Sequence, residues 1–564
     1  MNAVVSERRP APSSDETHGS TTAFAVSKLR VAFGSDSNSP VVDGVDFSVE
    51  AGKTLAIIGE SGSGKSVSLL AATGLLPARQ VTVSGRATVG QTDLLASSRR
   101  ELRSVRGREI GFVFQDPQSN LHPLKTIGAA ISEALTAHGR LPRKQVRARV
   151  LELLAEVGIR EPQQRIDDYP VQFSGGMRQR VNIAAALALH PRVLIADEPT
   201  TALDVTVQAG ILKLLKRLQD EHGTAIVFVT HDLAVVSDIA DTVTVMRSGK
   251  VVETAPAEQI YRTPAHPYTQ QLLSASRHRL PAGSTRAGSV SGTSPLLTLE
   301  KVSKQYSQRR SIAGTAALTD ISVDLRPGEI LGLVGESGSG KSTIGRIVAG
   351  LIRPTSGTAA HDGAVYNIAG DGLPKLTPAT RTAIQMVFQD PYASLNPRRT
   401  VASTLSEPLQ LHGSPGSGEL RESLEKLLTQ VGLSWDLLPR YPAQLSGGQR
   451  QRVAIARAIA LEPAVLVADE PVSSLDITTA QQIITLLRSL RDELGLAILF
   501  VSHDLGVVAA LCDRVAVLSA GEVVETGSTA EVFDNPAHPY TRGLIESIPG
   551  RRLLTENPDK AHHV

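Results

Sequence analysis

The sequence predicts an α/β fold that is built twice, as two tandem domains with a parallel β-sheet in each. Three observations lead to this prediction. Nearly every distinctive segment of the 564-residue chain occurs twice, one repeated segment is an apolar strand that runs into a glycine-rich loop, and further apolar strands alternate with helical stretches. The length agrees, because one domain usually comprises about 100 to 200 residues.

The duplication keeps one order along the chain. GESGSGKS begins at Gly59 and again at Gly335, an offset of 276 residues, and AHPYT begins at Ala265 and Ala537, an offset of 272. VFQDP, SGG, ADEP and HDL each recur between these segments in the same order. A period this long indicates two whole domains, since the repeats of solenoid proteins comprise about 20 to 50 residues.

The domain limits follow from composition. We expect domain 1 at residues 22–276 and domain 2 at residues 296–550. Residues 277–295 between them are rich in Gly, Ser, Pro and Thr, which predicts a flexible linker. Residues 1–21 lack the apolar stretch of a secretory signal and predict a disordered leader, and residues 551–564 predict a loose tail.

Composition excludes several classes of protein. Lys and Arg number 58 against 56 Asp and Glu, so the net charge of +2 lacks the positive surplus that nucleic-acid binding favours. The single cysteine, Cys512, excludes an intramolecular disulfide, a multi-cysteine zinc site and a four-cysteine iron–sulfur cluster within this chain. No run reaches the roughly 18 consecutive apolar residues of a membrane-spanning helix, so we expect the chain not to cross a bilayer itself.

Short apolar runs locate the expected strands, and longer periodic stretches locate helices. The strands that precede the glycine-rich loops are TLAIIG at 54–59 and EILGLVG at 329–335, the strands that end in acids are VLIAD at 193–197 and VLVAD at 465–469, and helical stretches cover 208–219 and 480–490. AIVFVT and AILFVS add another strand to each domain.

Both GESGSGKS segments fit the phosphate-loop pattern G-x-x-x-x-G-K-[ST] between a strand and a helix. The glycines let backbone N–H groups turn toward phosphate oxygens, and the helix adds its positive N-terminal end. We expect Lys65 and Lys341 to contact the β- and γ-phosphates, and Ser66 and Ser342 to bind Mg²⁺. The candidate nucleotide-binding residues of the loops are Gly59, Ser61, Gly62, Gly64, Lys65, Ser66 and Val67, and Gly335, Ser337, Gly338, Gly340, Lys341, Ser342 and Thr343.

Paired acids end one strand of each domain. Asp197 and Asp469 stand where a carboxylate can hold the Mg²⁺ shell, and Glu198 and Glu470 stand where one can polarise the attacking water. Beside a phosphate loop, this pair predicts hydrolysis of a nucleoside triphosphate.

FSGGMRQR at 173–180 and LSGGQRQR at 445–452 resemble the signature of ATP-binding cassette (ABC) ATPases. The resemblance implies two P-loop NTPase domains of the ABC type, each a RecA-like parallel-sheet core plus a helical subdomain, with ATP and Mg²⁺ as ligands. It extends to Gln115 and Gln389 as Q-loop residues and metal ligands, to Asp204 and Asp476 in the D-loops TALD and SSLD, to His231 and His503 as switch histidines, and to Phe33 and Tyr306 as residues that stack on adenine.

The resemblance also implies a head-to-tail arrangement in which each domain completes the other's site. Backbone N–H groups of a signature segment can then bind the γ-phosphate held by the opposite phosphate loop. Lys65 and Ser66 should face Ser446, Gly447 and Gly448, and Lys341 and Ser342 should face Ser174, Gly175 and Gly176. Because both glutamates and both histidines are present, we expect two competent sites. Met177 stands where the other half has Gln449, which suggests a slower site there.

FQDPQSNLHPLKTIG at 114–128, FQDPYASLNPRRTVA at 388–402 and the two AHPYT segments resemble ABC importers for dipeptides, oligopeptides, nickel and glutathione. The resemblance implies two membrane-spanning permease subunits, an extracytoplasmic binding protein and a place at the cytoplasmic face of the cell membrane. The cysteine-bearing tail that holds an iron–sulfur cluster in many members is missing, so no cluster is expected. Di- and oligopeptides are the favoured solutes, with nickel or glutathione as alternatives.

The main alternative function is that of a tandem ABC protein acting on ribosomes or DNA. Ribosome-acting members usually have a long charged linker, and DNA-acting members insert coiled coils or zinc modules between phosphate loop and signature. This chain has a short Gly/Ser/Pro-rich linker and only 115 residues between Gly59 and Ser174. A fused exporter ATPase is a further alternative that the AHPYT segments disfavour.

Overall fold

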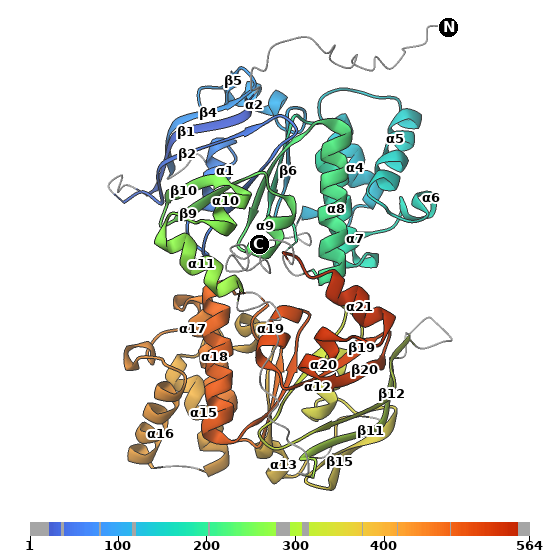
Figure 1. Cartoon of the computed structure of the whole chain (residues 1–564), viewed down its shortest axis with the longest axis vertical. Coiled ribbons are helices and arrows are strands. Elements are labelled where there is room, and N and C mark those ends of the chain that lie inside the picture. The colour runs from blue at the N-terminus through green and yellow to red at the C-terminus, as the bar shows by residue number, and fades with distance from the viewer. Residues whose placement is uncertain are drawn as a thin grey trace, which may run out of the picture.

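The computed structural model describes residues 22–34, 39–77, 81–115, 120–200, 203–277, 294–306, 315–370, 372–374, 376–413, 416–473 and 475–550. The expected leader, the expected tail and most of the expected linker lie outside the described residues. Figure 1 shows two halves of the same construction stacked along the long axis of the molecule. The domain limits 22–276 and 296–550 stay a prediction.

Each half has a six-stranded core sheet in which all strands but one edge strand are parallel. In half 1, the N-terminal half, the strand order is β10 (Lys250–Pro256), β9 (Thr242–Arg247), β3 (Thr54–Ile58), β8 (Ala225–Thr230), β7 (Val193–Asp197) and β6 (Ile110–Val113). In half 2, the C-terminal half, the strand order is β20 (Glu522–Ser528), β19 (Arg514–Ser519), β13 (Ile330–Val334), β18 (Ala497–Val501), β17 (Val465–Asp469) and β16 (Ile384–Val387). The expected parallel sheets are thus confirmed, with one antiparallel strand added at an edge of each.

A second, four-stranded antiparallel sheet in each half was not foreseen from the sequence. The orders are β2 (Val42–Glu50), β1 (Thr22–Phe33), β4 (Val81–Val89) and β5 (Thr92–Asp93), and in half 2 β12 (Thr315–Leu325), β11 (Leu297–Tyr306), β14 (Ser356–His361) and β15 (Ala364–Ile368). These strands are half-exposed, and bulges in β1 and β11 interrupt the alternation that would reveal them.

The helices form two groups in each half, one near the core sheet and one in a helical subdomain. Half 1 has α1 (Lys65–Ala72), α2 (Arg99–Val105), α4 (Ile127–Thr136), α5 (Arg143–Glu156), α6 (Pro162–Arg165), the 3₁₀ turn η1 (Pro170–Gln172), α7 (Gly175–Leu187), α8 (Val205–His222), α9 (Leu233–Ile239), α10 (Ala257–Arg262) and α11 (Pro267–Arg277).

Half 2 repeats the series. It has α12 (Lys341–Val348), α13 (Pro378–Ala383), α14 (Pro391–Ser394), α15 (Val401–Gly413), α16 (Ser417–Gln430), η2 (Trp435–Leu437), η3 (Pro442–Gln444), α17 (Gly447–Ile459), α18 (Ile477–Leu494), α19 (Leu505–Leu511), α20 (Thr529–Asp534) and α21 (Pro539–Glu546). The helical subdomains, α4–α7 and α15–α17, lie on opposite sides of the molecule in Figure 1, so the halves are arranged head to tail.

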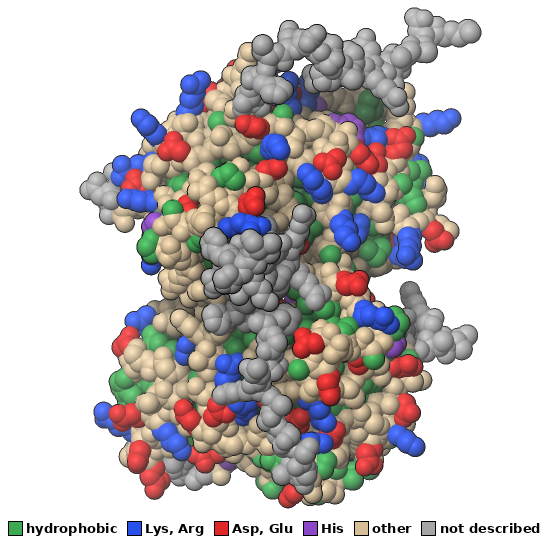
Figure 2. Space-filling view, in the orientation of Figure 1, with side chains coloured by type: hydrophobic (Ala, Val, Ile, Leu, Met, Phe, Trp, Pro, Cys, Tyr) green, Lys and Arg blue, Asp and Glu red, His purple; other side chains and the backbone are tan. Residues whose placement is uncertain are grey.

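The core sheet of each half is buried on both faces. On β8, Ile226 and Phe228 pack with the helical subdomain, while Val227 and Val229 pack with the antiparallel sheet and α1. This division follows from the alternation of side chains along a strand, and it explains why the core strands are continuously apolar. The face in Figure 2 mixes basic and acidic side chains. Within the described residues, no helix combines the length and apolar character needed to span a membrane.

Candidate functional site

Both phosphate loops join a core strand to a helix, as the sequence predicts. The loop after β3 leads into α1, and the loop after β13 leads into α12. A Cβ on Gly59 would lie 2.2 Å from the carbonyl oxygen of Met246, and one on Gly335 would lie 2.2 Å from that of Leu518. Only glycine fits at the start of either loop.

The phosphate-loop lysines are buried and folded into their loops. Lys65 Nζ donates to the carbonyl oxygens of Gly59 at 2.7 Å and Glu60 at 2.9 Å. Lys341 Nζ repeats this with Gly335 at 2.7 Å and Glu336 at 2.8 Å. Burial lowers the pKa of Lys65, while nearby carboxylates oppose that shift, among them Asp476 of the other half. Asp204 acts on Lys341 in the same way.

The serine that follows each lysine meets the strand-end aspartate. Ser66 Oγ donates to Asp197 Oδ1 at 2.9 Å, and Ser342 Oγ donates to Asp469 Oδ1 at 3.0 Å. Octahedral Mg²⁺ has oxygens at about 2.0–2.1 Å, which places neighbouring ligands about 2.9 Å apart, so each Ser–Asp pair fits two adjacent positions of such a shell. Burial raises the pKa of Asp197 to about 6, against the hydrogen bond from Ser66. Burial also raises the pKa of Asp469.

Mg²⁺ commonly takes one or two carboxylates together with phosphate and water oxygens. Among the described residues, no group of three or more His, Cys, Asp and Glu side chains is placed to hold a metal ion. The oxygens of the Ser–Asp pairs are donors of the type that Mg²⁺ takes, and the metal-ligand roles of these residues and of Gln115 and Gln389 stay a prediction. The expected absence of an iron–sulfur cluster stays a prediction.

The candidate catalytic glutamates are held from two sides. In half 1, Gln115 Nε2 donates to Glu198 Oε2 at 2.8 Å, and His231 Nδ1 lies 3.2 Å from Glu198 Oε1. In half 2, Gln389 Nε2 donates to Glu470 Oε2 at 2.7 Å, and His503 Nδ1 lies 3.0 Å from Glu470 Oε1. The structure thus joins three predicted residues into one cluster in each half.

The backbone at these glutamates is strained. Glu198 has φ of 46° and Glu470 has φ of 47°, in the left-handed region that side-chain-bearing residues rarely adopt. Such strain persists only where the surrounding structure imposes it, and it gathers at functional sites. In half 2, burial raises the pKa of Glu470, but the bond with His503 and nearby positive charges outweigh burial and lower it overall. Burial alone would lower the pKa of His503, but the hydrogen bond and negative charge of Glu470 outweigh burial, so the pKa of His503 is raised overall.

The signature segments begin α7 and α17, and each leading serine caps its helix. Ser174 Oγ accepts from the Met177 N–H at 3.3 Å, and Ser446 Oγ accepts from the Gln449 N–H at 3.2 Å. In half 2 the Gln449 side chain also accepts from the Ser446 N–H at 2.9 Å, which completes a capping box. Methionine has no oxygen with which to do this, so the two helix starts differ.

The signature glycines allow close packing on the next long helix. A Cβ on Gly176 would lie 2.3 Å from Val207 Cγ1, and one on Gly448 would lie 2.4 Å from Thr479 Cγ2. These contacts place each signature against the N-terminus of α8 or α18. Asp204 and Asp476 cap those helices, accepting from the N–H groups of Val207 and Thr479 at 2.9 Å each.

The same helix starts touch the phosphate loops of the opposite half. Thr478 Oγ1 donates to Glu60 Oε1 at 3.0 Å, and Thr206 Oγ1 donates to Glu336 Oε1 at 2.6 Å. Since Gly448 packs on Thr479, these bonds bring the half-2 signature to the half-1 phosphate loop. The pairing of Lys65 with Ser446–Gly448, and of Lys341 with Ser174–Gly176, agrees with this arrangement and stays a prediction at the level of individual contacts.

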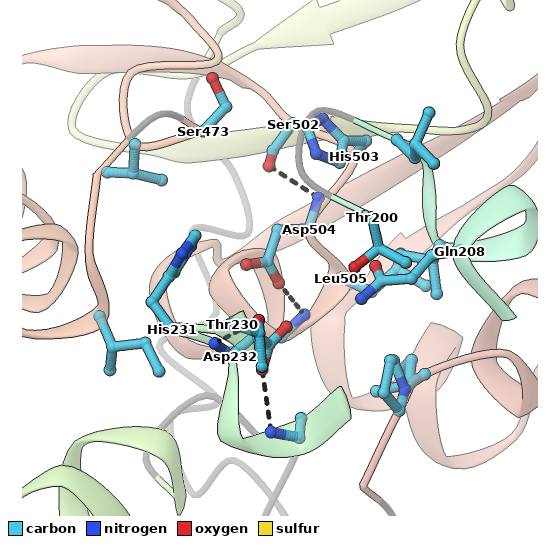
Figure 3. A pocket seen from close by; sticks show the side chains of 18 of the residues that line it. Thr200, Gln208, Thr230, His231, Asp232, Ser473, Ser502, His503, Asp504 and Leu505 are labelled. Carbon is cyan, nitrogen blue, oxygen red and sulfur yellow. Dashed lines mark hydrogen bonds between the residues drawn. The ribbon is translucent and has the colours of Figure 1, made fainter. Parts of the chain in front are cut away.

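A cavity of about 140 Å³ lies between the halves. Its lining includes both switch histidines and the residues Thr200, Gln208, Ser473 and Asp504, drawn from both halves (Figure 3). The D-loop residues Thr201, Ala202 and Ser474 lie outside the described residues.

The candidate adenine-stacking residues lie near strand ends. Phe33 ends β1 with 43% of its surface exposed, and Tyr306 ends β11 with 41% exposed. Lys304 Nζ lies 5.5 Å from the centre of the Tyr306 ring. Exposed rings are free to stack on a base, and this role stays a prediction.

Sequence reasoning missed the residues that join the parts of each site. These residues form two chains of hydrogen bonds, one linking Tyr268, Glu60 and Thr478 and the other linking Tyr540, Glu336 and Thr206. The glutamates recur at an offset of 276 residues and the threonines and tyrosines at an offset of 272, and that recurrence was the available signal.

Comparison with known proteins agrees with this geometry. The family model "ABC transporter" matches residues 42–201 and 318–473, and the model "Oligopeptide/dipeptide transporter, C-terminal region" matches residues 252–316 and 524–558. The chain is 43% identical over 574 residues to the glutathione import ATP-binding protein GsiA of Salmonella choleraesuis (strain SC-B67), covering 95% of this chain and 91% of that protein. It is 42% identical over 586 residues to GsiA of Escherichia coli O157:H7, covering 97% and 93%.

Among solved structures, cbiO1 from Clostridium perfringens, part of the ABC transporter complex cbiONQ, is 30% identical. The match covers 43% of this chain and 92% of that one, with a TM-score of 0.38. The family models recur in both halves, as the duplicated motifs do. The chain therefore belongs to the ABC transporter ATPases, as a tandem ATP-binding subunit of the peptide, nickel and glutathione importer family.

Proposed function

We propose that this chain hydrolyses ATP at two sites between its halves to energise import of glutathione through two partner permeases. The observation that carries the proposal is the 43% identity to a glutathione import ATP-binding protein over 95% of this chain, which includes both halves. The proposal places the chain at the cytoplasmic face of the cell membrane, with an extracytoplasmic binding protein as a further partner.

Glutathione, the solute in this proposal, was one of the alternatives that the sequence analysis gave, whereas its main prediction was di- and oligopeptides. The motifs favoured di- and oligopeptides, with nickel or glutathione as alternatives, and the relatives favour glutathione. Glutathione is itself a tripeptide, so the change concerns which peptide is carried. In this proposal the residues that select the solute belong to the permeases and the binding protein.

In this proposal the residues of one site come from both halves. Lys65 and the loop N–H groups bind the β- and γ-phosphates, and the half-2 signature closes over the γ-phosphate. Mg²⁺ held by Ser66, Asp197 and Gln115 would neutralise phosphate charge. Glu198, oriented by Gln115 and His231, accepts a proton from the attacking water.

His231 and His503 each turn Nδ1 toward a glutamate, so Nε2 is the nitrogen left for the γ-phosphate. A neutral imidazole that donates through Nδ1 has an acceptor at Nε2, whereas an imidazolium donates through both. The raised pKa of His503 favours the doubly donating form.

We infer that each permease docks beside a Q-loop glutamine. In half 1, the rings of Phe112 and Phe114 stack with centres 4.3 Å apart, and they line a cavity of about 420 Å³. Leu124, which precedes Lys125 of the cavity lining, is 80% exposed. In half 2, Phe388 is 38% and Tyr392 52% exposed. Exposed apolar side chains of this kind suit a short helix from a membrane partner.

The test begins with purification of the tagged chain from membranes in mild detergent and identification of its partners by mass spectrometry. Two multi-span permeases and a binding protein are expected. The complex is then placed in proteoliposomes with ATP, and uptake of labelled glutathione, a dipeptide and Ni²⁺ is compared. Glutathione uptake that requires ATP supports the proposal. Uptake of only the dipeptide or Ni²⁺, or recovery of ribosomal proteins without permeases, would overturn it.

Two variants serve as controls for that assay. Glu198→Gln with Glu470→Gln should abolish uptake while the complex still forms, because it removes the proposed base at both sites. Leu124→Glu should weaken permease recovery without changing ATP binding, because it places a charge on the proposed docking surface.

A further inference from the structure

The AHPYT segments reach the phosphate loops of their own halves. The hydroxyl of Tyr268 accepts a hydrogen bond from the backbone N–H of Glu60 at 3.3 Å, and the hydroxyl of Tyr540 accepts one from Glu336 at 3.1 Å. Both contacts join residues more than 200 positions apart, at 208 and 204. Their occurrence in both halves indicates a feature of the site rather than an accident of local packing.

Each tyrosine is presented from a fixed position. In half 1, Glu253 of β10 accepts from the N–H groups of Ala265 at 2.8 Å and His266 at 3.0 Å, and His266 Nδ1 accepts from the Tyr268 N–H at 3.1 Å. In half 2, Glu525, Ala537, His538 and Tyr540 form the same bonds at 2.8, 3.0 and 3.2 Å. The AHPYT segment is therefore anchored to the core sheet before its tyrosine meets the loop.

The glutamate that receives the tyrosine also faces the other half. Glu60 Oε1 accepts from Thr478 Oγ1, two positions after the D-loop aspartate Asp476, and Glu336 Oε1 accepts from Thr206 Oγ1, two positions after Asp204. One residue of each phosphate loop thus bonds through its backbone to the AHPYT segment of its own half and through its side chain to the opposite half.

We propose that Tyr268 and Tyr540 are positioning residues of the two ATP sites, which orient the second residue of each phosphate loop so that its carboxylate meets the threonine of the opposite half. The inference rests on the phosphate loops being the ATP sites. Its consequence is that the geometry of each loop depends both on the AHPYT segment and on closure of the halves.

The physical reason lies in how a phosphate loop binds. Its ligands are successive backbone N–H groups, so a small rotation of the Glu60 peptide moves donors that must converge on phosphate oxygens. A hydrogen bond of this kind contributes about 1 kcal/mol, which corresponds to roughly a fivefold change in affinity. The tyrosines should therefore act on ATP binding more than on the chemical step.

The environments of the two tyrosines differ. The guanidinium of Arg247 lies 4.7 Å from the centre of the Tyr268 ring, whereas half 2 has Ser519 at the matching position, near the Tyr540 hydroxyl. The tyrosine-to-loop contact is common to both halves, so the proposal depends on the contact and not on Arg247.

The test measures ATPase activity of the full chain in complex with its permeases, as KM for ATP and kcat. Tyr268→Phe with Tyr540→Phe should raise KM roughly fivefold with kcat changed less than about twofold. Thr478→Val with Thr206→Val should raise KM similarly. The combination of all four should raise KM by much less than the product, because both bonds act through the same glutamates. An unchanged KM in the tyrosine variant, or strictly multiplicative effects, would overturn the proposal.

Conservative variants guard against loss of folding. Glu60→Gln with Glu336→Gln keeps an oxygen that can accept from the threonines and should hold KM within about twofold, whereas alanine at both positions should raise it roughly fivefold. Equal effects of Gln and Ala would contradict the proposed bridge.

A matched control exists in half 1. Tyr261 is a buried tyrosine of α10 whose hydroxyl donates to the Leu233 carbonyl oxygen, and half 2 has Phe533 at that position. Tyr261→Phe should leave KM unchanged, and a rise equal to that of Tyr268→Phe would point to general loosening of the fold. Binding of a fluorescent ATP analogue to Lys65→Ala with Lys341→Ala separates the two hypotheses, because retained binding there would refute the ATP sites themselves.

Discussion

Thr478 donates a hydrogen bond to the carboxylate of Glu60 at 3.0 Å, although 418 positions separate them in the chain. The bond joins the segment after one D-loop to the phosphate loop of the other half, and Thr206 donates the equivalent hydrogen bond to Glu336. Each phosphate loop is therefore contacted by the opposite half, and we expect substitutions in one half to alter the site whose lysine lies in the other.

Replacing one glutamate by glutamine should show whether the two sites turn over equally. Glu198→Gln and Glu470→Gln should each lower the rate at its own site by about 10²- to 10⁴-fold, because each removes a general base. If the site that pairs Lys341 with the Met177-containing signature is the slower one, Glu198→Gln costs more of the total activity. Steady-state ATPase rates of the two variants measure this, and equal residual rates would remove the asymmetry.

Met177→Gln should convert the start of α7 into the arrangement of α17. A glutamine there can accept from the Ser174 N–H as Gln449 does from Ser446. The added bond should stabilise the helix by about 0.5 kcal/mol or more. Urea unfolding measures the gain, and Gln449→Met should give a loss of similar size. A gain without the matching loss would show that the capping box is not the cause.

Gly176→Ala should destabilise the protein by about 1–3 kcal/mol, because the new Cβ would lie 2.3 Å from Val207 Cγ1. Valine is stiff about χ1, so the methyl cannot move aside without shifting the backbone of α8. Gly175→Ala is the matched control for stability, since its Cβ would lie 3.6 Å from Leu203 Cδ2, an ordinary contact. Equal urea midpoints for the two variants would contradict the close-packing argument.

The His503–Glu470 pair should stabilise the fold within a defined pH window. The pKa of His503 is raised above its usual 6.5, so its contribution is complete below pH 6.5 and is lost as pH rises through the raised value. The pKa of Glu470 is lowered below 4.5, so its contribution is complete above pH 4.5 and is lost as pH falls through the lowered value. Both are present between pH 4.5 and 6.5.

His503→Gln should therefore lower the urea midpoint most near the middle of that window and less at alkaline pH. Unfolding of both proteins at several pH values measures the difference. A difference that stays constant from acid to alkaline pH would show that the pair contributes no charge interaction.

The antiparallel sheets show why part of the fold escaped prediction. Core strands such as β7 are continuously apolar because both faces are buried, and such runs are legible in the sequence. The strands of the second sheet are half-exposed and bulged. β1 pairs with β4 although the phosphate loop and α1 lie between them in the sequence. Their partners depend on contacts between distant segments, which no local pattern specifies.

The sequence by itself determined the duplication, the phosphate loops, the acidic strand ends and the family, because each depends on residues that are adjacent in the chain. The phosphate-loop residues follow one another from Gly59 to Ser66, and Asp197 directly precedes Glu198. Only the tertiary structure decided that Tyr268 accepts a hydrogen bond from the Glu60 N–H and that Thr478 of the other half donates one to the Glu60 carboxylate. Those contacts arise from the docking of separately folded elements, whose relative positions depend on the packing of whole surfaces.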